Sequence, residues 1–403
     1  MNIKSLLLGS AAALIAVSGA RAADAVVVAE PEPAEYVKIC DVYGAGYFYI
    51  PGTETCLRIG GYVREDIGVG DAGSFDGVNH VSDHQGDGDH STYWKNTRFT
   101  LKTWTGQETE LGTLKTYTEY RMNFGNNYGE YGSSTLAGGT EPNPNAGTAG
   151  WRAGNKSSAL EFAWIQLGGL RVGADESAFD TFIGYAGNVI NDTIVPYGGF
   201  QTNVIQYYFD AGNGFSAVVS LEEGEGVVGT IDSYVPHVVG GVKYTQGWGA
   251  ITGVVAYDSN YEEVAGKVRL DVNVSNELSL FAMVGYGSDG NLNEVHNPIT
   301  QPGAIDALGR GFYKVWGGNW AVWGGGTYKF NEKTSFNLQA SYDDWKDIGL
   351  AANVAYTIVP GFTITAEADW QRVGQGAIDN NSVWVSATKK NNVGGILRFQ
   401  RDF

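Results

Sequence analysis

The sequence predicts an all-β fold, and three observations carry that prediction. Segments of about ten residues alternate apolar and polar side chains along most of the chain. The connections between these segments alternate between short and, mostly, long. After residue 22, no run of roughly 18 apolar residues could form a membrane helix. Because lipid-exposed backbone must be fully hydrogen-bonded, such a chain can cross a membrane only as a closed, transmembrane antiparallel β-barrel.

The first 22 residues have the features of an export signal. Lys4 precedes an apolar stretch over residues 6–17, and Ala20-Arg21-Ala22 has the small-x-small form that signal peptidase cleaves. A short membrane anchor is the alternative, although the stretch is shorter than the roughly 20 residues that a spanning helix needs. We therefore expect a signal peptide over residues 1–22, a short acidic leader over 23–36 and one barrel domain over 37–403.

Composition limits the partners and the fold. Removal of Lys4 and Arg21 with the signal takes the net charge from −18 to −20, so nucleic acid is not an expected partner. On length alone the chain would suggest two or three soluble domains, but closed β-barrels depart from that rule. The 58 glycines and only 10 prolines suit many strands and turns.

Cys40 and Cys56 are the only cysteines in the sequence. An exported protein meets an oxidising compartment, where two cysteines this close in sequence can form a disulfide. Closing a loop of about 15 residues would contribute roughly 3 kcal/mol in the chain-entropy model. The bridge would fasten the segment before the first strand to that strand; two free thiols are the alternative.

The alternation gives each segment one apolar face and one polar face. In residues 263–275, valines and a leucine at even positions alternate with Lys267, Arg269 and Asp271. A soluble sandwich would alternate too, but it would have fewer segments and no reason to place its long connections at one end. Sixteen segments fit the pattern, at residues 55–66, 94–104, 112–124, 158–167, 169–175, 202–210, 215–222, 237–244, 249–257, 263–275, 278–286, 319–330, 335–342, 348–359, 362–371 and 392–403.

The connections differ in length from one end of the expected barrel to the other. Short joins lie at residues 211–214, 245–247, 275–277, 331–334 and 360–361, and long ones at 67–93, 125–157, 176–201, 287–318 and 372–391. Outer-membrane barrels have short periplasmic turns and longer external loops. No blade-like motif repeats, so a propeller is poorly supported.

Aromatic side chains flank the short joins, with Tyr207 and Phe209 before Phe215 and Tyr244 before Trp248. Aromatic rings favour the membrane–water interface, and barrels carry aromatic girdles at both rims. We interpret these residues as the periplasmic girdle; ordinary core packing is the alternative.

Both ends of the barrel segment resemble alphaproteobacterial general porins. Residues 37–41 (VKICD) and 44–62 (GAGYFYIPGTETCLRIGGY) closely resemble the opening of these proteins, and residues 394–403 (GGILRFQRDF) are similar to their last strand. The resemblance implies a sixteen-stranded barrel in the bacterial outer membrane, surrounded by lipid and lipopolysaccharide. It also implies homotrimers and passive diffusion of small hydrophilic solutes and ions, with no cofactor.

In the family that the sequence resembles, the third external loop folds into the barrel and narrows it. Here that loop would span residues 176–201, which contain no lysine or arginine. We expect an acidic group on and beside this loop: Asp175, Glu176, Asp180 and Asp192. Opposite it we expect a basic wall on the inward faces of the first three strands and the last: Arg58, Arg64, Arg98, Lys102, Lys115, Arg121 and Arg398.

The two groups would create a transverse field at the constriction. The alternative is that each basic residue pairs with a neighbouring acid of the wall, such as Asp66 or Glu119. Ion selectivity does not follow from the sequence, because the acid-rich external loops favour cations whereas the wall carries many basic residues.

A metal site is not expected. Five residues of the first long loop could in principle bind a divalent cation, but their spacing matches no complete calcium-loop motif. A solvated acidic loop is the simpler interpretation. The five residues are Asp83, His84, Asp87, Asp89 and His90.

Catalysis is not expected either. Four of the five histidines lie in expected loops, and neither a Gly-x-Ser-x-Gly elbow nor a phosphate-binding loop is present. Two further functions remain open at this point. One is an adhesin or structural anchor with a closed lumen, and the other is a substrate-selective pore, for example for sugars, in which Trp323 or Tyr117 would provide a stacking surface.

Overall fold

The computed structural model describes residues 38–70, 78–126, 153–156, 158–288, 310–374 and 391–403. The expected signal peptide and leader, residues 1–22 and 23–36, lie outside this part of the chain. The unit Ile39–Phe403 forms the fold described below.

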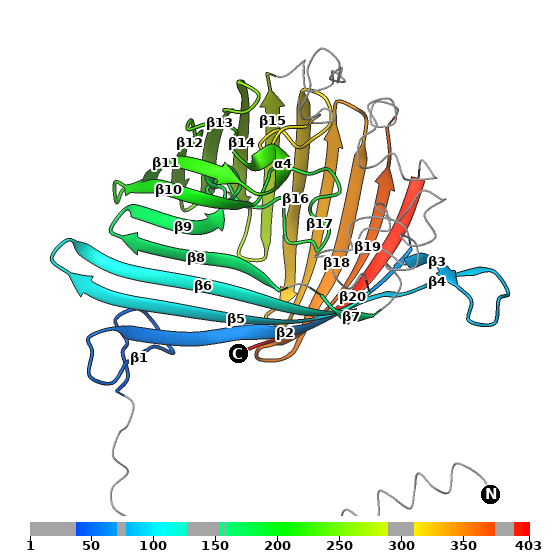
Figure 1. The fold of residues 1–403 in the computed structure, drawn as a ribbon, viewed down its shortest axis with the longest axis horizontal. Coiled ribbons are helices and arrows are strands. Elements are labelled where there is room, and N and C mark those ends of the chain that lie inside the picture. Colours follow the sequence, from blue (N-terminus) through cyan, green and yellow to red (C-terminus); the bar gives the residue numbers. More distant parts are fainter. Residues whose placement is uncertain (1–37, 71–77, 127–152, 157, 289–309, 375–390) are drawn as a thin grey trace, which may run out of the picture. The chain divides into compact units, whose positions relative to one another are not determined.

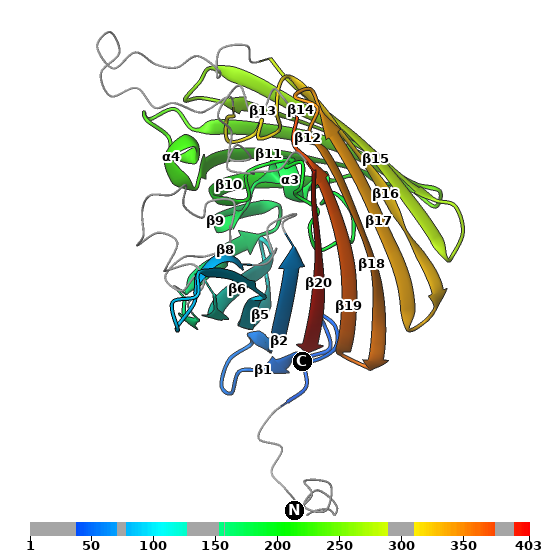
Figure 2. The ribbon, with the colours of Figure 1, turned by 90° about the vertical axis from the view of Figure 1, so that its right-hand side faces the viewer.

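Sixteen antiparallel strands form one closed barrel within the described residues (Figure 1). Consecutive barrel strands pair with each other, and β2 pairs with β20, from Tyr62 opposite Asp402 to Gly70 opposite Gly394. Figure 2 shows these two strands side by side at the seam. The barrel strands are β2 (Cys56–Gly70), β5 (Trp94–Thr109), β6 (Gly112–Gly125), β8 (Ala159–Leu167), β9 (Leu170–Glu176), β10 (Gln201–Asp210), β11 (Phe215–Gly224), β12 (His237–Gln246), β13 (Gly249–Asp258), β14 (Glu263–Asn273), β15 (Leu278–Gly287), β16 (Trp320–Asn331), β17 (Thr334–Asp343), β18 (Ile348–Val359), β19 (Phe362–Arg372) and β20 (Asn391–Asp402). All sixteen expected segments are therefore confirmed.

The remaining elements are short. β1 (Phe48–Tyr49) pairs with β2, β7 (Gly154–Asn155) pairs with β6, and β3 (Val78–Ser82) and β4 (Asp89–Thr92) form a separate hairpin. Two one-turn helices are α3 (Ala178–Thr181) and α4 (Gly226–Gly229). Within the described residues, no helix combines the length and the apolar character that a membrane crossing requires.

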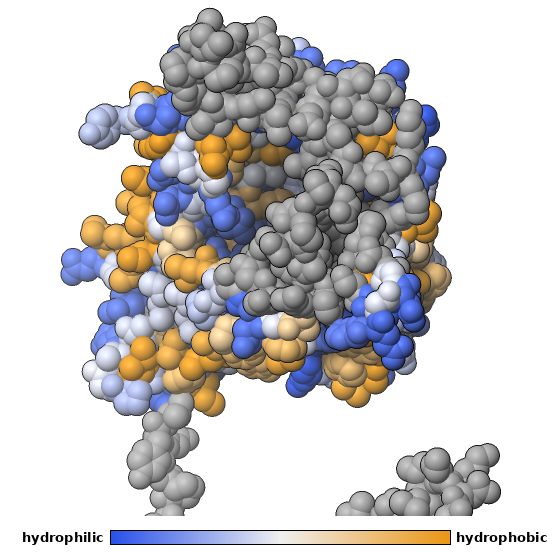
Figure 3. Space-filling model, turned by 45° about the vertical axis from the view of Figure 1, so that its right-hand side comes forward, coloured by the Kyte–Doolittle hydropathy of each residue, from blue (hydrophilic) through white to orange (hydrophobic). Residues whose placement is uncertain are grey.

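The barrel wall has its apolar face outside and its polar face inside. In β14, Val264, Val268 and Leu270 are 43%, 56% and 41% exposed, whereas Lys267 on the opposite face is 1% exposed. Figure 3 shows apolar residues gathered over the outside of the wall. A water-soluble fold would bury such residues, so this arrangement fits a wall surrounded by lipid and excludes the soluble sandwich.

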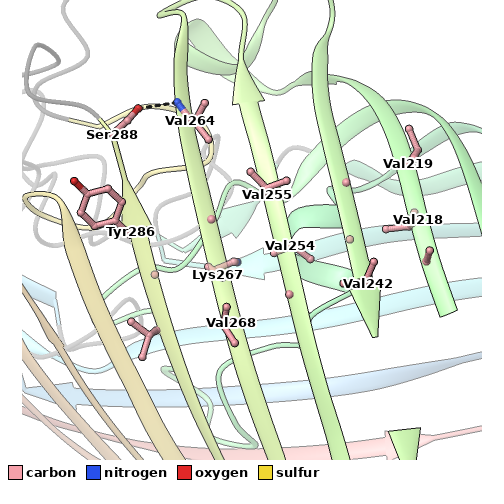
Figure 4. Close-up of a pocket in the computed structure, with 17 residues that line it drawn as sticks. Val218, Val219, Val242, Val254, Val255, Val264, Lys267, Val268, Tyr286 and Ser288 are labelled. Carbon is pink, nitrogen blue, oxygen red and sulfur yellow. Dashed lines mark hydrogen bonds between the residues drawn. The ribbon is translucent and has the colours of Figure 1, made fainter. Parts of the chain in front are cut away.

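The outer face has a hollow over β11 to β15. The hollow has a volume of about 860 Å³ and is lined mainly by valines and glycines. A Cβ atom added to Gly253 would meet nothing within 4 Å, so the missing side chain leaves open space on the surface. Figure 4 shows Val219, Val242 and Val255 among the residues that line the hollow, and the hydrogen bond that the backbone N–H of Val264 donates to the hydroxyl of Ser288.

Short joins lie at one end of the barrel, as expected. Residues 211–214 connect β10 to β11, and residues 360–361 connect β18 to β19. Gly212 and Gly361 adopt left-handed φ values of 74° and 80°, which glycine tolerates without a Cβ clash. The aromatic side chains beside these joins point outward, since Tyr207 is 57% exposed and Tyr244 is 45% exposed. Core packing therefore does not explain them.

The expected disulfide between Cys40 and Cys56 is confirmed, with the two Cα atoms 6.0 Å apart. Both cysteines are buried. Backbone hydrogen bonding reinforces the link, because the N–H of Cys40 donates to the carbonyl of Tyr47 at 3.0 Å. The bridge holds the segment before β2 against the start of the barrel wall.

Replacement of both Cys40 and Cys56 by serine should lower the free energy of unfolding by about 3 kcal/mol, because the open chain gains loop entropy when it unfolds. Urea unfolding of the folded protein in detergent micelles measures the change. The wild-type protein in excess reductant is the control and should behave like the double variant. Equal midpoints for oxidised wild type and variant would contradict the prediction.

Candidate functional site in the barrel lumen

Residues 177–200 connect β9 to β10 and lie inside the barrel. The indole N–H of Trp323 in β16 donates to the carbonyl of Val195 at 2.7 Å, and the amide of Gln339 in β17 donates to the carbonyl of Asp192 at 2.7 Å. Figure 2 shows α3, which belongs to this loop, enclosed by the strands. The inward-folded third loop is therefore confirmed.

The first turn of the loop is fixed by a local cap and by the wall. The hydroxyl of Ser177 accepts a hydrogen bond from the backbone N–H of Phe179 at 3.1 Å, which starts α3. The same hydroxyl donates to Glu222 of β11 at 2.7 Å, and the N–H of Ala178 donates to that carboxylate at 2.9 Å. One carboxylate thus sets where the chain leaves the wall.

A buried ion pair joins the loop to β14. The ammonium of Lys267 lies 2.5 Å from the carboxylate of Asp180, and both side chains are fully buried. The ammonium also donates to the carbonyl of Tyr197 at 2.7 Å and lies 4.1 Å from the ring centre of Phe179. A buried charge is stable only when it is paired and hydrogen-bonded, so this contact fixes the loop at that position.

The far part of the loop is bound to β18 and β19. The backbone N–H groups of Ile190 and Asn191 donate to Glu367 at 2.5 and 2.7 Å. The amide of Asn353 donates to the same carboxylate at 2.8 Å and to the carbonyl of Asn188 at 3.1 Å. These bonds hold the loop against the wall opposite its starting point.

The acidic side chains at the loop are largely neutralised by their surroundings. The negative charge of Asp180 is balanced by Lys267, although burial still raises the pKa of Asp180 to about 6. Burial raises the pKa of Asp192 to about 7, because it disfavours the charged form. Its carboxyl oxygen accepts a hydrogen bond from the hydroxyl of Tyr197 at 2.6 Å. These two groups therefore present less negative charge to the lumen than a residue count suggests.

The other two acids of the expected acidic group lie at the end of β9. Asp175 accepts a hydrogen bond from Arg171 of the same strand at 2.7 Å, and Glu176 accepts one from the hydroxyl of Tyr185. Both carboxylates are buried. All four acids are thus engaged in contacts within the barrel.

The basic wall consists largely of ion pairs. Arg64 contacts Asp66 of the same strand at 3.1 Å, and Arg398 contacts it at 2.6 Å across the seam between β2 and β20. The carboxylate of Asp66 is fully buried. These two cations therefore have the pairing that the alternative interpretation of the sequence expected.

A second cluster lies on β5, β6 and β8. Lys102 and Arg121 contact Glu119 at 3.2 and 2.7 Å, and Arg121 also contacts Glu161 at 2.9 Å. Each acid is almost completely buried beneath its cations. The cluster carries matched charges at one height of the wall.

Three expected wall residues lie outside these clusters. Arg98 donates from Nε to Asn123 at 2.9 Å. Arg58 and Lys115 are exposed, and within the described part of the chain neither has a carboxylate partner. The guanidinium of Arg58 instead lies 4.7 Å from the ring centre of Trp104.

A cavity of about 480 Å³ lies between the inserted loop and the wall. Tyr185, Asn188 and Asp192 line it from the loop, and Asn353 and Arg398 line it from the strands. The loop and the wall thus leave a space that has polar side chains on both sides.

Several residues of the site were not identified from the sequence as partners of the loop. Lys267, Glu222 and Glu367 each lie on the inward face of a strand, so the alternation showed their direction but not what they contact. Trp323 does not provide the stacking surface considered above, because it is 2% exposed and bonded to the loop. Tyr117 is half-buried on the lumen wall.

The first-loop residues considered for metal binding lie in the hairpin of β3 and β4, from the turn into β4. The carboxylate of Asp83 accepts hydrogen bonds from the N–H groups of Gln85 and Asp87 at 2.8 and 3.0 Å, and His90 lies 3.5 Å from it. Within the described residues, no cluster of three or more His, Cys, Asp or Glu side chains could hold a metal ion.

A family model described as the porin subfamily matches residues 24–396. The chain belongs to this subfamily. The porin is 49% identical over 417 residues to porin Omp2b of Brucella canis and 48% identical over 416 residues to porin Omp2b of Brucella suis, with 100% of each chain covered.

Solved structures show the same fold at low sequence identity. The outer-membrane channel DcaP of Acinetobacter baumannii matches with a TM-score of 0.53 and 17% identity, covering 88% of this chain and 99% of DcaP. A mutant Rh. blastica porin matches with a TM-score of 0.52 and 11% identity, covering 86% and 100%. Family, relatives and fold together make the porin an outer-membrane channel protein and not an enzyme.

Replacement of Lys267 by methionine should loosen the inserted loop, because Asp180 is left buried without its cation, at a cost of roughly 3–5 kcal/mol. We expect a lower thermal midpoint and noisier open-channel current. Adding Asp180→Asn should recover part of both losses, since the buried charge is removed. Lys333→Met in the exposed join between β16 and β17 is the control. If the effects of Lys267→Met and Asp180→Asn were strictly additive, Lys267 and Asp180 would not depend on each other and the prediction would be wrong.

Proposed function

We propose that this porin lets small hydrophilic solutes and ions diffuse passively down their gradients, filtered by size and charge where residues 177–200 narrow the lumen. The observation that carries the proposal is the anchoring of this loop inside a polar barrel, with a cavity of about 480 Å³ beside it. A fixed obstacle in a polar lumen limits the size of the solutes that pass. No cofactor or energy source is needed.

Charge filtering in this proposal depends on the basic wall and the acidic loop group. The ion pairs at Asp66 and Glu119 reduce the net charge of the wall, and Lys267 balances Asp180. Arg58 and Lys115, which have no carboxylate partner within the described residues, then contribute to the field sensed by a passing ion. The carboxylates of the loop act mainly by holding it in position.

We infer further that the porin is exported by its signal peptide, with cleavage near Ala22, and assembles as a homotrimer in contact with lipid and lipopolysaccharide. The apolar outer wall supports contact with lipid. The trimer rests on the resemblance to general porins.

Single-channel recording of the refolded mature protein in a planar bilayer tests the proposal. We expect stepwise openings, and closures in three equal levels if three barrels act together. A correctly folded barrel that never conducts would overturn passive diffusion and favour the closed adhesin.

The same recording under a salt gradient tests the role of Arg58 and Lys115. Arg58→Gln and Lys115→Gln should each shift the reversal potential toward cation selectivity, because each removes a positive charge from the wall. Lys333→Gln removes a charge outside the lumen and should leave the reversal potential unchanged. An equal shift in all three variants would show that total charge, rather than the lumen wall, sets selectivity.

A further inference from the structure

Three aromatic side chains lie side by side on the lumen wall, on β5, β6 and β8. Trp104 is opposite Tyr117, and Tyr117 is opposite Trp164, in the pairing of these strands. The ring centres of Trp104 and Tyr117 are 5.4 Å apart with planes inclined by 29°, and those of Tyr117 and Trp164 are 5.7 Å apart. We refer to these three residues as the aromatic shelf.

The aromatic shelf lies between the charged cluster at Glu119 and the short joins. Tyr117 precedes Glu119 by two residues on the same face of β6, on the side of the join at residues 110–111. All three rings are half-buried, so part of each ring faces the lumen. The hydrogen bonds that bind the loop at residues 177–200 to the wall go to β9 to β11, β14 and β16 to β19, and not to the three strands of the aromatic shelf.

Cations stand at both ends of the aromatic shelf. The guanidinium of Arg58 lies 4.7 Å from the ring centre of Trp104, and that of Arg171 lies 4.0 Å from the ring centre of Trp164. Arg171 is held by Asp175 and Gln166, so its role is to cover the ring. Arg58, in contrast, is exposed and has no carboxylate partner within the described residues.

Lys115 adds a second cation that has no carboxylate partner within the described residues. It precedes Tyr117 by two residues on the inward face of β6 and is exposed. A planar apolar surface next to these two cations complements a solute that has a flat ring and a negative charge. Rings stack favourably at centre distances of about 4.5–7 Å, and a guanidinium binds a carboxylate through two hydrogen bonds.

The polar groups at the aromatic shelf fit a neutral sugar less well. Sugars need several donors and acceptors around a ring. Here the hydroxyl of Tyr117 already donates to Glu119 at 2.6 Å, and that carboxylate is occupied by Lys102 and Arg121. Arg58 and Lys115 are therefore the groups beside the aromatic shelf that can bind a solute.

We propose that the aromatic shelf, with Arg58 and Lys115, is a binding subsite for aromatic carboxylates on their way through the lumen. This subsite rests on the proposed channel function and adds a preferred substrate class to it. The solute ring stacks on Trp104 and Tyr117, and its carboxylate contacts Arg58 or Lys115. Residence at the subsite makes passage saturable for this class of solute and leaves it non-saturable for others.

Open-channel current in a planar bilayer, at low ionic strength, provides the test, with benzoate as the probe. Acetate has the charge without the ring, and nicotinamide has a flat ring without the charge. Benzoate should reduce the current in a saturable manner, and equal concentrations of the other two should not. Low salt is used because screening weakens the contact between the carboxylate and the exposed cations.

Variants separate stacking from charge. Trp104→Leu should raise the benzoate concentration for half-maximal block by roughly two- to tenfold, the range for loss of one aromatic pair. Arg58→Gln should also weaken the block, and because Arg58 is exposed this variant keeps the test decisive if Trp104→Leu does not fold. Tyr117→Phe keeps the ring and should retain the block. Trp320→Leu on the outer face and Lys333→Gln are controls that should leave it unchanged.

The outcomes distinguish this inference from the proposed function. Absence of any openings would overturn passive diffusion itself. Normal openings with no saturable effect of benzoate would overturn the subsite and leave diffusion intact. Block by benzoate that is as strong in Trp104→Leu and in Arg58→Gln as in the wild type would place the binding elsewhere. Equal block by acetate or by nicotinamide would overturn the requirement for both a ring and a negative charge.

Discussion

Closure of the hydrogen-bond ladder between β2 and β20 is the constraint on which the rest of the structure depends. An open sheet would present two rows of unpaired N–H and C=O groups to lipid, and each such group costs several kcal/mol in a medium without water. Once the ladder closes, every strand has one face toward lipid and one toward the lumen. The period of two in the sequence then decides which side chains meet lipid and which meet water, as Val268 and Lys267 show on adjacent positions of β14.

The polar interior created in this way provides the partners for a loop that would otherwise have none. Backbone groups of residues 177–200 bond to Gln339, Trp323 and Glu367, which are side chains of the wall and not of the loop. Two acids of the loop region are matched in the same manner, Asp180 by Lys267 and Asp175 by Arg171. These carboxylates of the described lumen are therefore structural groups that fix the loop and the cations of the wall in position.

The strands and the disulfide could be predicted because both depend on local properties of the sequence. The segment expected at residues 263–275 is β14, Glu263–Asn273. The contacts inside the lumen could not be predicted in this way. Alternation shows that Lys267 faces inward, but it does not show which side chain of the loop reaches it. The inward direction of Glu161 could not be predicted for another reason. The pairing of β6 with β8 shifts register between Glu119 and Tyr120, so Glu161 does not follow the simple alternation of its strand.

The seam also has a consequence for how the chain folds. The N–H of Gly61 donates to the carbonyl of Phe403 at 3.1 Å, and the N–H of Phe403 donates to the carbonyl of Gly61 at 3.0 Å. Every other pairing in the barrel wall joins consecutive barrel strands, which can meet as neighbours soon after they are made. The seam joins strands from opposite ends of the barrel sequence and carries the largest loop-closure entropy. The β2–β20 contact is therefore the pairing of the wall with the highest entropic cost, and the sheet becomes a closed cylinder only once that contact has formed.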